Sequence, residues 1–415
     1  MTLPSQTKPE IVITGVSTAT PLALDQQTLV TRLLAGETCI VPEFGEIDGD
    51  SVRNVGIIPD NHEAFTIDGE SGQYSILSRI LRLVIRNAVN DAGLFDIYGS
   101  RHEVPVLLGS CYGSKPDYYR LLAAQNTGQN IDRIIKEEFY NLKFREDAVT
   151  CEVEKLVGFQ LAKSTIISQC LSGFIAIALG ISMIQSGQRD FAIVGAFDLF
   201  DRIIYRIALE NGLLDKGFCK PFDQDHCGTN FSDGAGAIVI ESQSHAESRG
   251  ASNYYAKING LHIGNYPDVG GPMVSGICKA MTQALQSAGI SANQIDMISS
   301  HGTGIPKIDQ QECIALKKVF KDQVCDIPIT SYVPNVGYSF AASTFTDLAI
   351  AFDCMENNRV IGVLSPQTPL EAFKDYNFGV GTNQERPVNN VMKLKLSLNG
   401  GVGAMILSDV NSGVS

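Results

Sequence analysis

Short apolar runs and longer stretches with helical spacing alternate along most of the chain. The first run, residues 11–16, reads Ile-Val-Ile-Thr-Gly-Val and predicts a buried strand that ends in a tight turn. Further apolar runs predict strands at 104–109, 191–195, 237–241, 297–300, 360–363 and 404–407. Helical spacing predicts helices at 75–92, 173–185, 272–288, 310–320 and 344–357. This alternation favours an α/β fold with a largely parallel sheet that helices cover on both faces.

The chain divides into two stretches of similar organisation. Segment 242–253 is polar and rich in serine, and a second cycle of strands and helices follows it. We therefore predict two similar halves, residues 1–250 and residues 251–415. Residues 112–158 interrupt the first half with a Lys- and Glu-rich stretch that also contains Tyr and Phe, which is typical of an insertion of helices rather than of core.

Composition and charge narrow the class of protein. Of the 415 residues, 44% are hydrophobic and 19% are charged, which is typical of a compact globular chain with a sizeable core. The net charge is −13, and this argues against nucleic acid or an anionic membrane as partner, because phosphate binding needs clustered Lys and Arg. No apolar run has the length of a membrane span, and residues 1–10 do not resemble a signal peptide.

The cysteine pattern bears on cofactors and compartment. The ten cysteines are scattered, without a CxxC pair or a His/Cys cluster at metal-binding spacing. We therefore expect no disulfide framework and no metal, and a reducing cytoplasmic location fits best. Two Gly-rich segments, 233–236 and 399–403, lead into apolar runs rather than helices, so we interpret them as tight turns and expect no nucleotide cofactor.

Cys170 lies where the β-branched run Thr165-Ile166-Ile167 passes into an apolar helix. A thiol at this position is near the positive end of the helix dipole, which favours the nucleophilic thiolate. Thioester exchange uses such a thiolate. A cysteine in an apolar run is more often core filler, and on these residues alone that alternative stays open.

His301 opens the sequence His301-Gly302-Thr303-Gly304, directly after the apolar run that ends at Ser300. Glycines let the backbone approach a ligand closely. An imidazole in such a turn can polarise a thioester carbonyl or move a proton. A purely structural histidine is the alternative, and these residues alone do not decide between the two.

These residues belong to a larger pattern of four motifs. The motifs are Cys170 with Ser172-Gly173, then Ser186-Gly187 with Asp190, then Cys219-Lys220-Pro221-Phe222-Asp223 followed by Asp233-Gly234-Ala235-Gly236, then His301-Gly302-Thr303-Gly304. In this order and spacing they resemble the β-ketoacyl synthases. The resemblance starts in the first apolar run and continues to the Gly-rich turn near Gly400, so it covers nearly the whole chain.

The resemblance implies an α/β fold of the thiolase type, with two similar halves in a layered α-β-α-β-α arrangement. The first half carries Cys170, and the second carries His301 and Tyr338. Cys170 is then the acceptor of an acyl chain delivered on the phosphopantetheine arm of an acyl carrier protein, and His301 is one of two histidines that help to decarboxylate a malonyl extender. An oxyanion hole would come from the N–H of Cys170 and an N–H near Asn399 and Gly400.

The chain departs from the family pattern at three positions. The family segment Lys-x-Asn-x-Gly-His reads Val-Pro-Asn-Val-Gly-Tyr here, so Val333 replaces the lysine and Tyr338 replaces the second histidine. Tyrosine has an unperturbed pKa of about 10 and is a poor substitute for imidazole near neutral pH. Asn399 replaces an aromatic gate in the family's terminal Phe-Gly-Phe-Gly-Gly motif. These losses predict weak decarboxylative condensation.

We therefore expect a chain-length-factor-like, non-condensing subunit of a heterodimeric type II polyketide or polyene synthase. Such a subunit pairs with an active ketosynthase homologue across a large interface and shapes the acyl-chain tunnel. Asp347 supports this hypothesis, because its segment Phe-Thr-Asp-Leu-Ala resembles the Leu-Asp-Val-Ala segment of chain length factors. Residues 112–119 are tunnel-wall candidates by position, with an amphipathic surface helix as the alternative.

Retention of Cys170 keeps a second hypothesis open. Chain length factors usually lack this cysteine, so the chain is alternatively an active β-ketoacyl-[acyl carrier protein] synthase or an acyltransferase with Cys170 as acyl acceptor. A different activity on the same fold, such as degradative thiolysis, is a third possibility, which the Lys-Pro-Phe-Asp segment and the His-Gly-Thr-Gly motif fit less well. The expected partners in the first two cases are an acyl carrier protein and a ketosynthase-like subunit.

Overall fold

The computed structural model describes residues 8–41, 45–47, 50–52, 54–59, 62–65, 75–94, 103–113, 150, 153–154, 157, 160–215, 217–268 and 271–410. Ten strands form one hydrogen-bonded sheet. In order across the sheet they are β12 (Ile329–Thr330), β11 (Met297–Ser299), β15 (Asn390–Leu396), β16 (Gly401–Ser408), β8 (Ala256–Asn265), β1 (Ile11–Ala19), β7 (Gly234–Ser242), β6 (Phe191–Asp198), β4 (Val104–Ser110) and β5 (Leu161–Ile167).

Nine helices and three short two-stranded sheets accompany this sheet in the described part of the chain. The helices are α1 (Gln26–Leu34), α2 (Ile76–Asp91), α7 (Ser172–Gln185), α8 (Arg202–Glu210), α9 (Gln243–Ser248), α10 (Val274–Ala288), α11 (Pro306–Phe320), α12 (Val333–Val336) and α13 (Ser343–Glu356). The small sheets are β2 (Gly45–Ile47) with β3 (Asp50–Val52), β9 (Pro267–Asp268) with β10 (Gly271–Pro272), and β13 (Arg359–Val360) with β14 (Gln384–Glu385).

The large sheet is mixed, and the prediction of a largely parallel sheet was wrong. Parallel pairs lie only toward its two edges, where β4 pairs with β5 and β6, and β11 pairs with β12 and β15. The five pairs between them are antiparallel. Burial on both faces produces a continuous apolar run whichever way a strand points, so the runs could not reveal strand direction.

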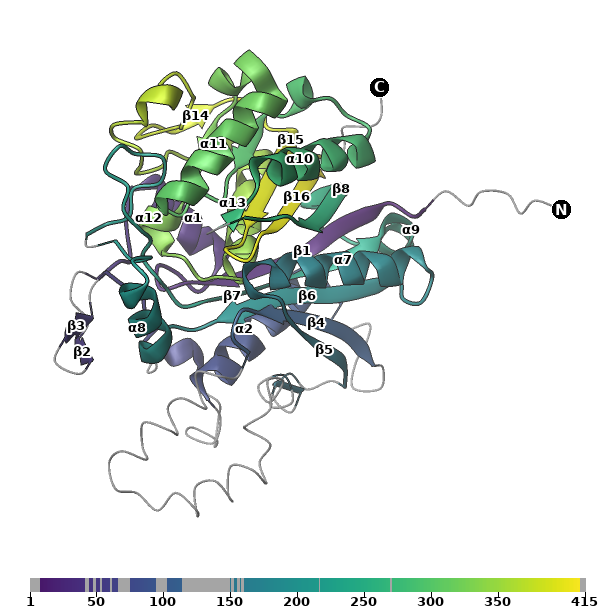
Figure 1. Cartoon of the computed structure of the whole chain (residues 1–415). Helices are drawn as coiled ribbons and strands as arrows, with labels where there is room; N and C mark the ends of the chain where they lie inside the picture. Colours follow the sequence, from purple (N-terminus) through teal and green to yellow (C-terminus); the bar gives the residue numbers. More distant parts are fainter. Residues whose placement is uncertain are drawn as a thin grey trace, which may run out of the picture.

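The helices form three layers, two outer layers and one inner layer between the two halves of the sheet. On one outer side α2 packs on β1, β6 and β7, and on the other outer side α10 and α11 cover β8 and β16. Between them α7 and α13 fill the inner face, where they share one core with both halves of the sheet. Figure 1 shows this stacking, with α11 at the top, α7 in the middle and α2 below. The layers agree with the thiolase-type α/β arrangement that the sequence implied.

Glycine lets the two outer helices approach the sheet closely. A Cβ on Gly15 of β1 would lie 2.2 Å from the carbonyl oxygen of Ala88 in α2. A Cβ on Gly260 of β8 would lie 2.1 Å from the carbonyl oxygen of Ala284 in α10. Real Cβ atoms do not come so close to backbone oxygen, so any larger residue would push the helix off the sheet.

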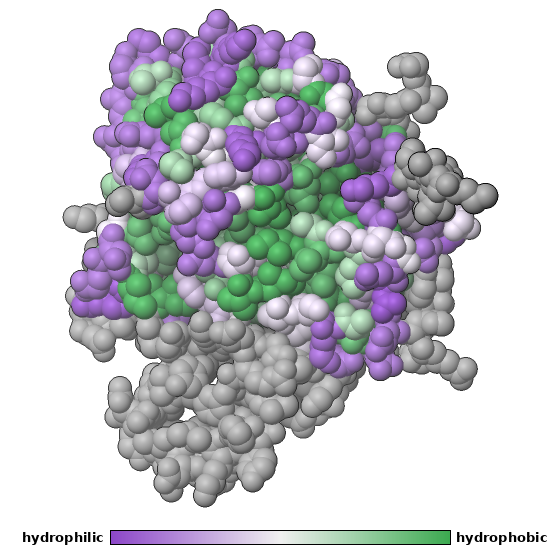
Figure 2. Space-filling view, turned by 45° about the vertical axis from the view of Figure 1, so that its right-hand side comes forward, coloured by the Kyte–Doolittle hydropathy of each residue, from purple (hydrophilic) through white to green (hydrophobic). Residues whose placement is uncertain are grey.

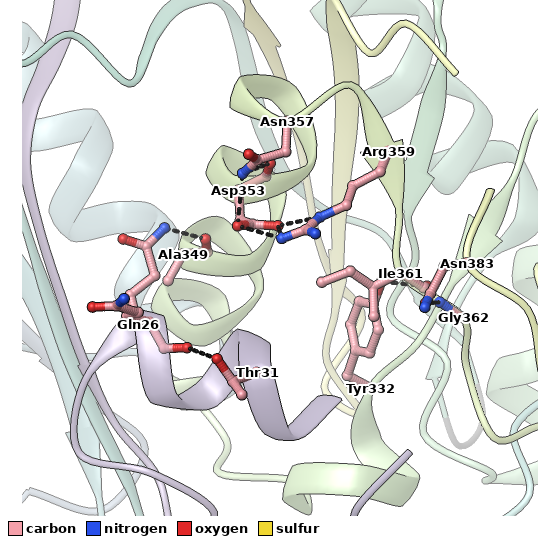
Figure 3. A network of polar contacts seen from close by, with 11 residues as sticks. Gln26, Thr31, Tyr332, Ala349, Asp353, Asn357, Arg359, Ile361, Gly362 and Asn383 are labelled. Carbon is pink, nitrogen blue, oxygen red and sulfur yellow. Dashed lines mark hydrogen bonds and ion pairs between the residues drawn. The ribbon is translucent and has the colours of Figure 1, made fainter. Parts of the chain in front are cut away.

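A polar network holds the central helix α13 in place. Asp353 near its C-terminal end forms a bidentate ion pair with Arg359, with N···O distances of 2.9–3.0 Å. The side-chain amide of Gln26 on α1 donates to the carbonyl of Ala349 at 2.7 Å. Figure 3 shows these groups around the end of α13. The network fixes the helix whose opposite end faces the candidate site.

The predicted helices are all present, with ends that differ by a few residues. The predicted strand at 360–363 is short, since β13 contains only Arg359–Val360. Three strands of the large sheet, β8, β12 and β15, were not predicted, and neither were the helices α1, α8 and α12. The serine-rich segment 242–253 contains a further helix that was not predicted, α9. Most of the predicted insertion at 112–158 lies outside the described residues. Among the described residues, no helix is both long and apolar enough to span a membrane.

Candidate active site

Cys170 lies in a single 3-10 turn (Gln169–Leu171) between β5 and α7, as the local sequence predicted. Ser172, the first residue of α7, accepts a hydrogen bond from the N–H of Ser168 and donates one to the carbonyl of Ser110 at the end of β4, both at 2.8 Å. Gly109 on β4 makes this close approach possible, because a Cβ there would lie 2.4 Å from the Ser172 backbone. The turn that carries Cys170 is therefore fixed to the neighbouring strand.

Two carboxylates from α11 hold the loop that begins at His301. Glu312 accepts the N–H groups of His301 at 2.7 Å and Gly302 at 3.0 Å. Asp309 accepts the N–H groups of Thr303 and Gly304, each at 3.2 Å. Both carboxylates are fully buried, and their spacing of three residues places them on one face of the helix. The loop backbone is thereby fixed with the His301 side chain toward the site.

Tyr338 follows α12 and lies beside His301. Their rings meet edge to face, with centroids 5.6 Å apart. The ammonium of Lys395, on the inner face of β15, lies 4.7 Å from the centre of the Tyr338 ring. Lys395 also donates a hydrogen bond to the hydroxyl of Ser343 at the start of α13. Strand β15 thus brings a buried cation next to Tyr338.

One cavity of about 660 Å³ joins these groups. Cys170, His301, Tyr338 and Asn399, four of the five predicted site residues, line it. The rest of its wall is mainly apolar and comes from Cys111, Tyr112, Ile167, Gln169, Ile204, Ile207, Ala208, Leu213, Thr229, Phe231, Thr303, Ile305, Ile308, Phe340, Leu396, Ser397 and Leu398. Tyr112, the first of the tunnel-wall candidates, packs edge to face on Phe340, whereas 114–119 lie outside the described residues.

The surroundings of Cys170 stabilise a thiolate. A hydrogen bond with Cys111, the charge of Lys395, and hydrogen bonds with Tyr338 and Ser397 lower the pKa of the Cys170 thiol to about 6, in opposition to burial. The hydrogen bond with Cys170, followed by burial, raises the pKa of the Cys111 thiol, so Cys111 is the S–H donor in this pair. At neutral pH the Cys170 thiol is therefore largely ionised.

His301 and Tyr338 are uncharged in this environment. Burial, followed by the charges of Lys395 and Lys393, lowers the pKa of the His301 imidazole well below its ordinary value. Burial and the nearby Cys170 raise the pKa of the Tyr338 phenol. A neutral imidazole and a protonated phenol both donate hydrogen bonds and neither takes a proton readily near pH 7. The imidazole N–H of His301 can polarise a thioester oxygen, whereas the Tyr338 hydroxyl is hydrogen-bonded to Cys170.

The predicted oxyanion turn lies between β15 and β16. Here the N–H of Gly400 donates to the carbonyl of Ser397 at 2.9 Å, and Gly400 has a φ of 91° that favours glycine. The side-chain oxygen of Asn399 accepts the N–H of Gly401 at 3.2 Å. Because the Gly400 N–H closes the turn, the N–H groups of Leu398 and Asn399 are the remaining candidates near this turn for the oxyanion hole.

Comparison with known proteins identifies the family. The family model described as "Beta-ketoacyl synthase, N-terminal domain" matches residues 8–246, and "Beta-ketoacyl synthase, C-terminal domain" matches residues 255–366. The chain belongs to the β-ketoacyl synthase family. This ketosynthase-family chain is 26% identical to nodulation protein E of Rhizobium meliloti, over 95% of its own length and 98% of that protein.

Two solved structures share the fold of this ketosynthase-family chain. One is the ishigamide ketosynthase/chain length factor, with a TM-score of 0.88 at 20% identity, covering 98% of this chain and 100% of that one. The other is AntDE:AntF, a type II polyketide synthase acyl carrier protein in complex with its ketosynthase bound to the hexaketide. It has a TM-score of 0.85 at 21% identity, and 97% and 100% of the two chains are covered.

Several functional neighbours were missed in the sequence. Asp309 and Glu312 were detectable from their spacing on the helix that follows His-Gly-Thr-Gly. Cys111 carried no local signal, because it meets Cys170 only through the parallel pairing of β4 with β5. Lys395 was missed because β15 was not predicted, and a lysine within an alternating segment is normally taken as exposed.

Proposed function

We propose that this chain accepts an acyl group on Cys170 from an acyl carrier protein of a type II synthase, and that it does not decarboxylate a malonyl extender efficiently. The observation that carries the proposal is the thiolate environment of Cys170, with Cys111, Lys395, Tyr338 and Ser397 around it. A thiol kept only as core filler would need none of these polar neighbours.

The cavity suits a thioester arm. The hydroxyls of Thr229 and Thr303 line it, and each is buried without a hydrogen-bond partner within the described part of the chain. A buried hydroxyl without a partner costs about 1–3 kcal/mol, which a ligand amide or carbonyl would recover. Ile207 and Leu398 also line the cavity and are 57% and 39% exposed, so its mouth is apolar. Phosphopantetheine has both amide and apolar segments.

The missing second imidazole limits the chemistry. Decarboxylation of a malonyl thioester builds up enolate charge that two neutral histidine side chains stabilise in active members of the family. Here Tyr338 supplies one hydroxyl, and this hydroxyl is already hydrogen-bonded to Cys170. Removing a preorganised donor of this kind costs about a hundredfold or more in rate. Acyl acceptance needs the thiolate and an oxyanion hole and is less affected.

A second candidate function is the chain-length-factor-like role, and the outer surface of the molecule favours it. Among the strands that the structure describes, β5 is the last of the sheet, and its outer edge can pair with another chain. The neighbouring α7 has an apolar outer face, on which Leu179 is 44% exposed and Ile175, Ile181 and Met183 are partly buried. Figure 2 shows apolar side chains gathered across this side of the molecule. An active ketosynthase homologue would extend the sheet at this edge.

A reconstitution separates the two candidates. Carrier proteins loaded with a medium-length acyl group and with malonyl are mixed with the chain alone, with its Cys170→Ala variant, and with an added active type II ketosynthase. We expect acyl loading of the wild-type chain alone, with no β-ketoacyl product and no release of carbon dioxide above background.

Each other outcome has a definite meaning. A β-ketoacyl product from the chain alone would make it a complete condensing enzyme and contradict the proposal. Product formation with the added ketosynthase that is unchanged in Cys170→Ala, with no acyl label on this chain, would favour the chain-length-factor-like role instead.

A further inference from the structure

Lys395 is a buried cation without a carboxylate ion-pair partner in the part of the chain that the structure describes. Its side chain is only 1% exposed, and its ammonium donates to the Ser343 hydroxyl. Lys393, two residues earlier and equally buried, forms an ion pair with Asp347 at 2.6 Å. A buried ammonium is costly unless a negative charge compensates for lost hydration. The positive charge of Lys395 therefore needs another partner.

Cys170 is the group that fits this requirement. The ammonium of Lys395 lies against the ring of Tyr338, and Tyr338 is hydrogen-bonded to Cys170. The charge of Cys170 is the largest influence that raises the pKa of Lys395, and Lys395 in turn lowers the pKa of Cys170. The nearby Asp198 carboxyl accepts backbone N–H groups of Cys111 and Ala341, each at 2.9 Å, and burial raises its pKa to about 7, so it offers Lys395 less negative charge than an ordinary carboxylate.

We propose that Cys170 and Lys395 form a buried thiolate–ammonium pair, in which Lys395 keeps the resting thiol ionised and gives up its proton when the thiol is acylated. Lys395 is a positioning residue in this scheme, because it acts on the acyl donor through Cys170. The other titratable groups that face the pair are Cys111 and Tyr112 after β4, Asp198 at the end of β6, His301 after β11, Tyr338 after α12, Lys393 on β15 and Asp347 on α13.

The acyl step balances in charge and protons. The Cys170 thiolate attacks the thioester carbonyl, the bond between that carbon and the pantetheine sulfur breaks, and the pantetheine leaves as a thiolate that takes up one proton. The new thioester on Cys170 carries no charge, so Lys395 loses its partner and releases one proton. This step rests on the proposed function, whereas the ion pair in the resting protein does not.

The first test is the pH dependence of Cys170 alkylation by iodoacetamide, measured on the Cys170 peptide in the wild-type, Lys395→Met and Lys395→Arg proteins. The wild-type rate should be half-maximal near pH 6 and level above it, because the thiolate reacts. Lys395→Met should move this midpoint up by about two pH units, so that alkylation at pH 7 falls about tenfold. Lys395→Arg keeps a positive charge and should keep the low midpoint. The exposed Cys227 serves as the reference thiol in every digest.

A second measurement needs no variant, so it tests the pair even if the Lys395→Met protein does not fold. Protein labelled with carbon-13 at the lysine ε-carbons is titrated by NMR before and after alkylation of Cys170. Burial lowers the pKa of Lys395 to about 8, and a neutral thioether on Cys170 should lower the pKa of Lys395 further because it removes the partner charge.

Two results would overturn the pair. One is a folded Lys395→Met protein whose Cys170 alkylation profile equals that of the wild type. The other is a Lys395 titration that does not move after Cys170 is alkylated. Neither experiment uses a carrier protein, so a failure of acyl loading would contradict the proposed function alone.

Discussion

Gly109→Ala should destabilise the protein and disturb Cys170 together. The new Cβ on β4 would lie 2.4 Å from the carbonyl carbon of Ser172 and 2.6 Å from the backbone nitrogen of Gly173. These backbone atoms cannot rotate away, so α7 has to move by about 1 Å before contacts become ordinary. Overpacking of this kind costs about 1–3 kcal/mol, and we expect a value near 3 kcal/mol because the clash is with backbone. The first turn of α7 adjoins Cys170, so its alkylation rate at pH 7 should fall as well.

The assay is urea unfolding of Gly109→Ala and of a control variant, with the rate of Cys170 alkylation at pH 7 measured for each. Gly217→Ala is the matched control, since its Cβ would meet nothing closer than the Asp215 carboxylate at 3.8 Å. We expect the control to stay within about 0.5 kcal/mol of the wild type. Equal stability and equal Cys170 reactivity of the two variants would refute the argument that this close approach positions the nucleophile.

Three further predictions follow from single contacts. Cys111→Ala removes the S–H donor that lowers the pKa of Cys170, so the midpoint of Cys170 alkylation should move up from near pH 6; an unchanged midpoint would contradict this. Glu312→Gln leaves one N–H of the His301 loop facing an amide nitrogen instead of a carboxylate oxygen. The free energy of unfolding, measured by urea titration, should therefore fall by about 2 kcal/mol. An unchanged free energy of unfolding would show that the loop does not depend on the carboxylate. Leu179→Asp should weaken self-association or pairing with a ketosynthase in sedimentation experiments while the thermal unfolding midpoint of the dissociated chain stays unchanged.

Local signals were sufficient to place Cys170 and His301. Cys170 follows a β-branched run and precedes a helix, and His301 follows a short apolar run and opens a Gly-rich turn; these features depend on neighbours in the sequence. The same signals predicted α2, α7, α10, α11 and α13, but not α1, which packs beside α13. These signals could not predict strand direction, because an apolar run indicates that a strand is buried and not which way it points.

The electrostatic half of the site depends on contacts that are remote in the sequence. Lys393 and Lys395 interrupt the apolar pattern of β15, and they are buried because their face of that strand packs against α13, whereas Met392 and Leu394 on the opposite face belong to the core below α10 and α11. Cys111 reaches Cys170 through strand pairing across about 60 residues. The replacement of the family's lysine by Val333 and of its second histidine by Tyr338 was visible in the sequence, whereas the buried position of Lys395 was not.

The central claim is that Cys170 is a working acyl acceptor. The most direct test is the intact mass of the isolated chain after exposure to an acyl carrier protein that carries a medium-length acyl group, with peptide mapping of the modified residue. The account predicts one acyl group per chain, located on Cys170 and absent from Cys170→Ala. An unmodified wild-type chain, under conditions in which an active ketosynthase is fully loaded by the same carrier protein, would contradict it.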